Sequence, residues 1–327
     1  MPSEHLKRRT FAIISHPDAG KTTLTEQLLK ASGHIRVAGM VRAKRSGRFT
    51  VSDWMDIERE RGISVTSTAI RLTLHDRVIN ILDTPGHQDF SEDTLRTLLA
   101  ADFSVMVLDC SKGVEPQTIK LFEVCALRGI PVISFINKID LPSKDYFDLF
   151  DELQSVLGIE PSPMNLPNGT GLNFRGICAL DDPELPRESL ELRELTSKFD
   201  VQKFLAGKQT PVFWGSAIKG IGVSELFDFI LSSELYPKPQ RVLLNGAEKV
   251  LDPGDDVFVG FVFKVQSNIN KNFRSRTAFL KVLSGELERH DSYYNPRLKT
   301  FLRASRIYSL FGQRMETVDK SFAGDVV

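Results

Sequence analysis

The most informative segment of this 327-residue sequence is Ser15-His-Pro-Asp-Ala-Gly-Lys-Thr22. It follows the apolar run Thr10–Ser15, which predicts a buried strand, and it leads into a helical pattern over Lys21–Ala31. At such a strand-to-helix turn, successive backbone N–H groups and the helix N-terminus can enclose a phosphate group. The segment therefore predicts a phosphate-binding loop, with a serine in the place of the first glycine. Lys21 is expected to contact the β- and γ-phosphates, and the Thr22 hydroxyl is expected at a Mg²⁺ position.

Short apolar runs alternate with longer amphipathic segments from Thr10 to about Leu235, which is typical of buried parallel strands joined by crossover helices. This pattern predicts a doubly wound α/β domain. Strands are expected at Thr10–Ser15, Val65–Leu74, Val78–Leu82, Ser104–Asp109, Pro131–Asn137 and Pro211–Gly215. Helices are expected at Lys21–Ala31, Gln88–Ala100, Gln117–Arg128, Tyr146–Leu157 and Val223–Leu231. The second strand alternates apolar and polar residues, so we expect it to be antiparallel and nearer the sheet edge.

A second motif, Asp83-Thr-Pro-Gly-His87, directly follows the expected strand Val78–Leu82. A carboxylate at a strand end can reach a metal ion, often through a water molecule. Gly86 lets the backbone N–H approach a γ-phosphate, and the His87 imidazole can orient or polarise an attacking water. By itself this segment could equally be a Pro-Gly turn with a surface histidine.

A third motif, Asn137-Lys-Ile-Asp140, ends the strand Pro131–Asn137. The Asp140 carboxylate can accept two hydrogen bonds from the N1–H and N2–H₂ edge of guanine, a pattern that adenine cannot offer. Asn137 and Lys138 would brace the phosphate loop and cover the base, and Ser216-Ala217 could offer a backbone N–H to the guanine O6. One such tetrapeptide could be an ordinary polar loop. Three motifs in this order, each at the carboxyl end of an expected strand, predict a guanine-nucleotide site.

A long polar segment, about residues 33–66, separates the phosphate loop from Asp83. From Ile35 to Ser52 it carries basic residues and no acid. Its position in the chain predicts a switch segment that becomes ordered around the γ-phosphate and Mg²⁺. Ser64 is the first candidate ligand for the Mg²⁺ and Thr66 is the second. The alternative is a solvated surface loop.

Three sets of site residues follow from these motifs. The expected catalytic residue is His87. The residues expected to bind Mg²⁺ are Thr22, Ser64 and Asp83. The residues expected to bind GTP or GDP are Ser15, His16, Pro17, Asp18, Ala19, Gly20, Lys21, Thr22, Thr23, Asp83, Thr84, Pro85, Gly86, His87, Asn137, Lys138, Asp140, Ser216, Ala217 and Ile218.

A second domain is expected after the two prolines of Tyr236-Pro-Lys-Pro-Gln240, where the apolar period changes from helical to two. We therefore divide the chain into a nucleotide-binding domain, residues 1–236, and a small β-barrel or sandwich, residues 237–327. An apolar run has just begun at the last residues, so we expect the barrel to be truncated at its C-terminal end. Lys264–Arg306 holds ten Lys and Arg against three Asp and Glu, which suits contact with rRNA phosphates or a solvated barrel face.

Composition excludes several classes of protein. Forty-two basic and forty-two acidic side chains leave no net charge, and 41% hydrophobic residues are typical of a globular chain. Three cysteines without metal-ligand spacing disfavour a disulfide framework or a zinc site. No apolar run approaches the roughly 20 residues needed to cross a bilayer. We expect a soluble, cytoplasmic monomer with no membrane partner.

The three motifs, together with Arg61-Gly-Ile-Ser64, resemble those of the translational GTPases. Asp53-Trp-Met55 and Asp89-Phe-Ser-Glu-Asp-Thr-Leu-Arg-Thr97 resemble, more narrowly, bacterial members of the release-factor type. The resemblance implies a GTPase that the ribosome stimulates through the sarcin-ricin loop of its large-subunit rRNA. It also implies that GTP hydrolysis on the ribosome promotes dissociation and recycling of class-I release factors.

The family pattern further implies that Pro17 and Ile63 flank His87 as an apolar gate, and that Asp18 lies near the metal and the sarcin-ricin loop. The segment Leu141–Gln209 is shorter than the family leads us to expect. Two alternatives stay open. One is a translocase resembling elongation factor G, against which the Ser-Glu-Asp-Thr run after His87 counts. The other is a GTP-gated ribosome-binding module with negligible hydrolysis. An ATP-using kinase would not need the Asn-Lys-x-Asp motif.

Overall fold

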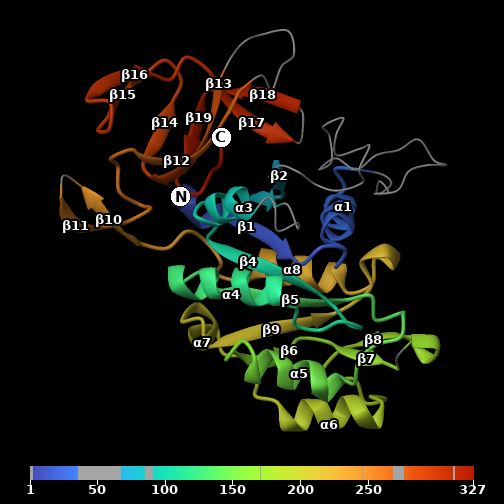
Figure 1. Ribbon diagram of the computed structural model, residues 1–327. Helices are drawn as coiled ribbons and strands as arrows, with labels where there is room; N and C mark the ends of the chain where they lie inside the picture. Colours follow the sequence, from blue (N-terminus) through green and yellow to red (C-terminus); the bar gives the residue numbers. More distant parts are fainter. Residues whose placement is uncertain are drawn as a thin grey trace. The chain divides into compact units, whose positions relative to one another are not determined.

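The computed structural model describes residues 3–35, 68–84, 91–169, 171–244, 246–267, 276–311 and 314–327. The chain divides into two compact units (Figure 1). We call Phe11–Thr68 with Asp83–Ser233 the motif unit, and Met1–Thr10, Ala69–Leu82 and Glu234–Val327 the terminal unit. The division falls within three strands, β1 (Arg8–Ser15), β2 (Thr68–Leu74) and β3 (Arg77–Asp83). The predicted boundary near residue 236 stays a prediction.

Parallel strands form the centre of the motif unit, in the order β1-β4-β5-β9-β6. Their bounds are β4 (Phe103–Asp109), β5 (Val132–Asn137), β9 (Gln209–Trp214) and β6 (Glu160–Pro163). Every residue of β1, β4, β5 and β9 is buried, which explains why these segments are near-continuous apolar runs rather than alternating ones. The helices are α1 (Lys21–Ala31), α3 (Ser91–Leu98), α4 (Pro116–Arg128), α5 (Tyr146–Ser155) and α8 (Val223–Ser232). Parallel strands joined by helices confirm the predicted doubly wound α/β fold.

Two predicted helices are too long. The helix expected to reach Ala100 ends at Leu98, where the N–H of Leu99 and of Ala100 bonds a carbonyl three residues back and tightens the last turn. The first residues expected in this helix, 88–90, lie outside the described ranges. The helix expected to reach Leu157 ends at Ser155, because Gly158 turns the chain with a φ of +68°.

The part of the motif unit that the sequence pattern describes least well lies between α5 and β9. No helix or strand is expected there, yet the segment forms β6, β7 (Leu166–Asn168), β8 (Gly176–Cys178), α6 (Arg187–Leu195) and α7 (Val201–Leu205). The strand β6 is Glu160-Pro-Ser-Pro163 and lies last in the order of parallel strands. Proline has no N–H for a central strand but is tolerated at an edge, so the strand carries no recognisable strand pattern.

Antiparallel pairs make up most of the terminal unit. They are β10 (Gln240–Leu244) with β11 (Ala247–Leu251), β12 (Val259–Ser267) with β13 (Arg276–Ser284), β14 (Glu286–Glu288) with β19 (Lys320–Phe322), β15 (Ser292–Asn295) with β16 (Thr300–Arg303), and β17 (Ile307–Phe311) with β18 (Arg314–Val318). Val282, Leu287, Ile307 and Val327 form an apolar core on which Phe258 and Tyr293 pack. Antiparallel strands around one core agree with the predicted small β domain.

The strand β2 (Thr68–Leu74) pairs antiparallel with β17, through Ile70 and Phe311, as its alternating pattern predicts. Its expected place near the edge needs a correction, because β17 and β18 lie beyond it in the strand order. These strands come from the end of the chain, and nothing in the local sequence of β2 signals a partner more than 200 residues away.

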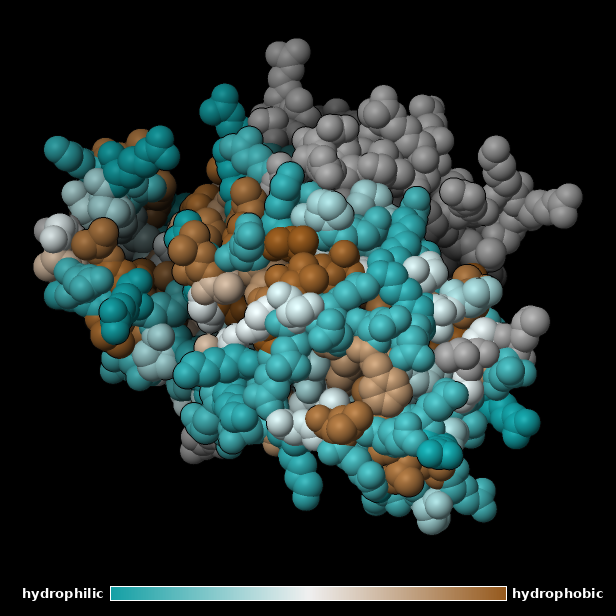
Figure 2. Space-filling model, turned by 60° about the horizontal axis from the view of Figure 1, so that its bottom comes forward, coloured by the Kyte–Doolittle hydropathy of each residue, from teal (hydrophilic) through white to brown (hydrophobic). Residues whose placement is uncertain are grey.

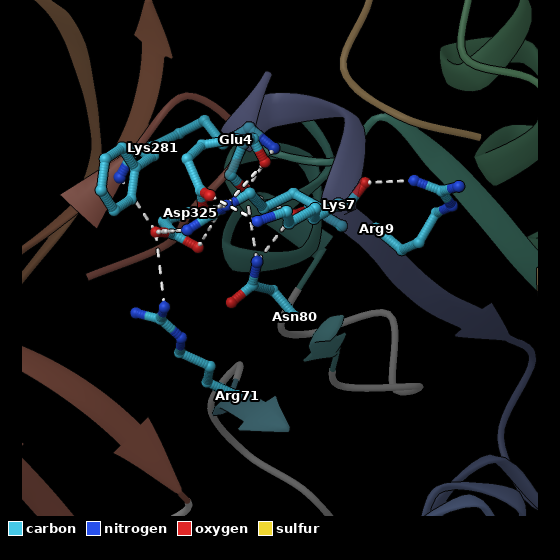
Figure 3. A network of polar contacts seen from close by, with 11 residues as sticks. Glu4, Lys7, Arg9, Arg71, Asn80, Lys281 and Asp325 are labelled. Carbon is cyan, nitrogen blue, oxygen red and sulfur yellow. Dashed lines mark hydrogen bonds and ion pairs between the residues drawn. The ribbon is translucent and has the colours of Figure 1, made fainter. Parts of the chain in front are cut away.

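A buried polar network, which we call the Asp325 cluster, connects strands of the terminal unit to the Gly324–Asp325 turn (Figure 3). Asp325 is 0% exposed and accepts hydrogen bonds from Arg8, at 3.3 Å from Nε to Oδ1, and from the Phe322 N–H at 3.0 Å. Arg71 of β2 lies 3.5 Å from Asp325 Oδ2. One carbonyl, that of Gly324, accepts from Thr10, Asn80 and Lys281 at 2.6, 3.2 and 3.1 Å.

Gly324 itself is required by this packing. Its φ is +98°, and a Cβ there would lie 2.6 Å from Pro237 Cγ and 2.8 Å from Arg8 Cβ. Real side chains do not approach so closely, so the turn that presents the Gly324 carbonyl and the Asp325 carboxylate needs glycine.

The face drawn in Figure 2 is mostly hydrophilic, and its apolar residues form separate patches. Among the residues that the structure describes, no helix is both long and apolar enough to cross a membrane.

Candidate nucleotide-binding site

The phosphate loop lies between β1 and α1, as predicted. Asp18 and Gly20 have φ values of +63° and +99°, and Gly20 is the residue before α1. Gly20 has no side chain to cap this helix, and the first turn carries no acid. A helix N-terminus of this composition favours an anion. A Cβ at Gly20 would overlap the Asn137 amide, so the loop can close on Asn137 only with glycine at this position.

Asn137, at the end of β5, contacts two loops. Its amide nitrogen donates to the Ala19 carbonyl at 2.7 Å, and its amide oxygen accepts from the Ala217 N–H at 2.8 Å. The same side chain therefore fixes the phosphate loop and the loop after β9 relative to β5.

Lys138 has the bracing position that was expected of it. Its ammonium donates to the Asp18 carbonyl at 2.5 Å and to Asp109 Oδ2 at 2.7 Å. Burial alone would raise the pKa of Asp109, but hydrogen bonds from Lys138 and Ser111 hold that pKa below its usual value. Asp109 was not among the predicted site residues, although its place at the end of the expected strand Ser104–Asp109 could have indicated it.

Lys21 and Asp83 form a buried ion pair. Thr84 follows and donates from its hydroxyl to the Ile13 carbonyl at 2.7 Å, which ties the end of β3 to β1. Mg²⁺ prefers oxygen ligands and, beside nucleotide phosphates, uses only one or two carboxylates. A Thr22 hydroxyl and an Asp83 carboxylate, both next to Lys21, fit such an ion. Ser64, Pro85, Gly86 and His87 lie outside the described residues.

The predicted base-binding end is formed by Asp140 and the loop after β9. Asp140 Oδ2 lies 3.3 Å from the Lys219 ammonium. Although burial raises it, the pKa of Asp140 is held below its usual value by the Ser216 hydroxyl and by Lys219. The carboxylate is therefore ionised at neutral pH, as an acceptor for two N–H groups must be. Ile218, also predicted here, is 70% exposed.

The loop after β9 is held in a narrow turn. The N–H of Ser216 and the N–H of Ile221 each bond the other residue's carbonyl at 3.0 Å. A Cβ at Gly215 would overlap the Ile221 carbonyl and the Phe135 ring. The turn presents the 3-10 helix Ala217–Lys219 next to Asn137.

His16 has a partner that was not predicted. Its side chain is 2% exposed, and its Nε2 lies 2.6 Å from Glu115 Oε2. Burial lowers the pKa of His16, and the Glu115 carboxylate offsets only part of that shift. Glu115 precedes α4 and belongs to no motif that the sequence analysis used.

The structure thus brings the described parts of the three motifs to one edge of the parallel sheet, with the loop after β9 beside them. We call Lys21, Asp83, Asp109, Lys138 and Asp140 the nucleotide cluster. Within it Lys21 pairs with Asp83 and Lys138 with Asp109, both carboxylates lying at strand ends, while Asp140 pairs with Lys219 outside the cluster.

Two family models match this chain. The elongation factor Tu GTP binding domain matches residues 6–234, and elongation factor G domain 2 matches residues 257–327. A protein of Bordetella pertussis named peptide chain release factor 3 is 43% identical over all of this chain and 67% of its own length. A Staphylococcus haemolyticus protein of the same name is 44% identical over 98% of this chain and 67% of its own.

A solved crystal structure of a Thermus thermophilus protein has the same fold. It matches 97% of this chain with a TM-score of 0.79 and 24% sequence identity, and this chain spans about half, 51%, of that chain.

Proposed function

Because the chain belongs to the translational GTPases, in the release factor 3 family, we propose that it hydrolyses GTP on the ribosome and thereby promotes dissociation and recycling of class-I release factors. The observation that carries the nucleotide part of this proposal is the position of Asp140. Its ionised carboxylate lies beside the Ser216–Ala217 turn, and Asn137 connects that turn to the phosphate loop.

Each described residue has a role in this proposal. The Lys21 ammonium contacts the β- and γ-phosphates, so its contact with Asp83 is exchanged or shared when nucleotide binds. The N–H groups before and within the first turn of α1 bind the phosphate oxygens. Asp140 accepts from N1–H and N2–H₂ of guanine, and the Ala217 region donates to O6.

Mg²⁺ would be held by Thr22 and Asp83, with Ser64 as the switch ligand, and when bound it neutralises charge on the β- and γ-phosphates. His87 orients the attacking water, as the sequence motif suggests, and Pro17 and Ile63 flank it. The proposed external activator is the sarcin-ricin loop of the large ribosomal subunit, and the proposed setting is a cytoplasmic monomer.

Single-turnover GTP hydrolysis with and without ribosomes tests the proposal. We expect slow hydrolysis alone and an acceleration of roughly 10³ to 10⁵ by ribosomes, the range that an element supplied in trans can give. His87→Ala should remove roughly 10² to 10⁴ of the stimulated rate and leave GDP affinity unchanged.

The release-factor part needs its own assay, because the chain spans 67% of its named relatives. Labelled class-I release factor is bound to ribosomes after peptide release, and its exchange is followed with GTP present. No acceleration of exchange, with normal ribosome-stimulated hydrolysis, would leave a GTPase without the recycling role. Binding to ribosomes without stimulated hydrolysis would indicate a GTP-gated binding module.

A further inference from the structure

We infer that Glu115 is a positioning residue for the phosphate loop and acts through His16. This inference rests on the proposed nucleotide site. It assigns to the loop between β4 and α4 a role that no nucleotide-binding motif of this chain supplies.

The contact between the two side chains is close and sheltered. His16 is buried, and its Nε2 lies 2.6 Å from Glu115 Oε2. A carboxylate at this distance favours the proton on Nε2, because an unprotonated nitrogen would place a lone pair against an anion. Glu115 therefore sets both the tautomer and the orientation of the imidazole.

Glu115 is itself held in place. It precedes Pro116, whose fixed φ starts α4, and its side chain does not cap that helix. The preceding turn is tied by the Gly113 N–H to the Asp109 carbonyl at 2.8 Å, and by the Val114 N–H to Glu152 Oε2 at 2.8 Å. Because its backbone is held and its carboxylate does not cap its own helix, Glu115 can hold a side chain of the phosphate loop.

Three residues of the phosphate loop are held from outside it. Asn137 holds the Ala19 carbonyl and Lys138 holds the Asp18 carbonyl, and both belong to the recognised motif. His16 is held by Glu115. Asp109, which orients Lys138, comes from the same β4–α4 segment as Glu115. This segment therefore contributes two of the carboxylates that fix the loop.

The negative charge of Glu115 also argues against direct contact with a nucleotide. A carboxylate that faced the nucleotide would repel its phosphates, whereas Glu115 is engaged with His16 and lies 3.9 Å from the Lys112 ammonium. Its expected contribution is therefore to the geometry of the loop and not to a contact with the ligand.

The test is Glu115→Gln, and the matched control is Glu123→Gln, at an exposed position of α4, the helix that Glu115 precedes. We expect a roughly tenfold rise, about 1.4 kcal/mol, in the Kd for a fluorescent GDP analogue and in KM for GTP, because the His16 ring loses the charged partner that orients it. We expect kcat on ribosomes to stay within about twofold, because Glu115 does not touch the reacting atoms. Glu115→Asp should recover part of the affinity.

A loss of folded protein is distinguished by stoichiometry, because unfolded molecules reduce the number of sites and leave the Kd of the others unchanged. The ¹⁵N spectrum of the His16 ring gives a readout without nucleotide: wild type should hold the proton on Nε2, and Glu115→Gln should give a mixture of tautomers. Unchanged Kd and ring spectrum in Glu115→Gln would overturn this inference alone. Failure of the wild-type chain to bind GDP would overturn the proposed function and the inference together.

Discussion

The nucleotide cluster and the Asp325 cluster are both sets of paired charges, but they are built in opposite ways. In the nucleotide cluster, Lys21 and Asp83 lie in short motifs, each at the carboxyl end of a strand. In the Asp325 cluster, Arg8 and Asp325 are 317 positions apart, and the partners come from β1, β2, β3, β13 and the turn after β19. The first kind of cluster carries a local sequence signature, and the second does not.

The two clusters also differ in what can replace their partners. If Lys21 binds phosphates, a nucleotide can take over the place of its carboxylate, so the nucleotide cluster is coupled to ligand. Asp325 is fully buried against Arg8, Arg71 and the Phe322 N–H. Its contribution to stability should therefore not depend on nucleotide.

The largest effect is expected from Asp325→Asn. It removes the buried carboxylate that Arg8 and Arg71 share, and Arg8 keeps its ion pair with the partly exposed Glu4. Removing one partner of a buried pair costs about 3–5 kcal/mol. Urea unfolding measures the loss. Asp319→Asn, at an 85% exposed carboxylate paired with Arg289, is the control and should change little. If both variants lost the same free energy of unfolding, burial of the carboxylate would not determine the size of the effect.

Lys21→Ala should weaken GDP binding by roughly 10- to 150-fold, which corresponds to about 1.5–3 kcal/mol for a bond to a charged group. Titration with a fluorescent GDP analogue measures it, and Lys30→Ala, on an exposed position of the same helix, is the control. Saturating GDP should raise the urea midpoint of wild type more than that of Lys21→Ala. The folded molecules of Asp325→Asn should show the same rise in urea midpoint with GDP as wild type. If GDP no longer raised the midpoint of this variant, the two clusters would not be independent.

Asp140→Asn should move preference from guanine to xanthine nucleotides, by roughly tenfold or more, about 1.4 kcal/mol. Xanthine carries a carbonyl at C2 where guanine carries an amine, and an amide can donate to it where a carboxylate cannot. Competition between GTP and XTP is the measurement. A variant that still selects GTP would show that Asp140 does not contact the base.

The smallest effect is a pH dependence through His16. Burial lowers its pKa in the folded chain, so the unfolded chain binds the proton more readily. The contribution of His16 to stability is therefore complete above its unfolded pKa, about 6.5, and is lost as the pH falls below that value. His16→Gln should flatten the fall in stability between about pH 7.5 and 5.5, the window around that unfolded value. Burial also lowers the pKa of His5 in the terminal unit, so a residual slope should remain.

The parallel core of the motif unit could be predicted because its signals are local. Buried strands produce continuous apolar runs, and the phosphate loop follows β1 as expected. The nucleotide residues Asn137, Lys138 and Asp140 lie where their motif places them, at the end of β5. Their roles in binding stay predictions, as does that of His87.

The rest depends on contacts that no local pattern contains. Glu115 meets His16 only because α4 begins where the phosphate loop turns. The strand β6 has two prolines, and its position at the edge of the parallel strands is set by tertiary contacts and not by its local sequence. The hairpin β10–β11 is different, because the sequence Asn245-Gly246 is a strong local hairpin signal, and the hairpin could have been predicted from it.

The distance along the chain between Arg8 and Asp325 also sets an order of events during synthesis. A nascent chain emerges from its N-terminus, and compact units fold as their residues become available. The parallel core of the motif unit is complete by Ser233, whereas Arg8, Arg71 and Asn80 must wait for the Gly324–Asp325 turn, roughly ninety residues later. Until then their polar groups remain in water, and the closing contacts have to form across a very long loop. Ribosomes paused before codon 324 should therefore carry chains that already bind GDP but whose terminal unit is still open to protease.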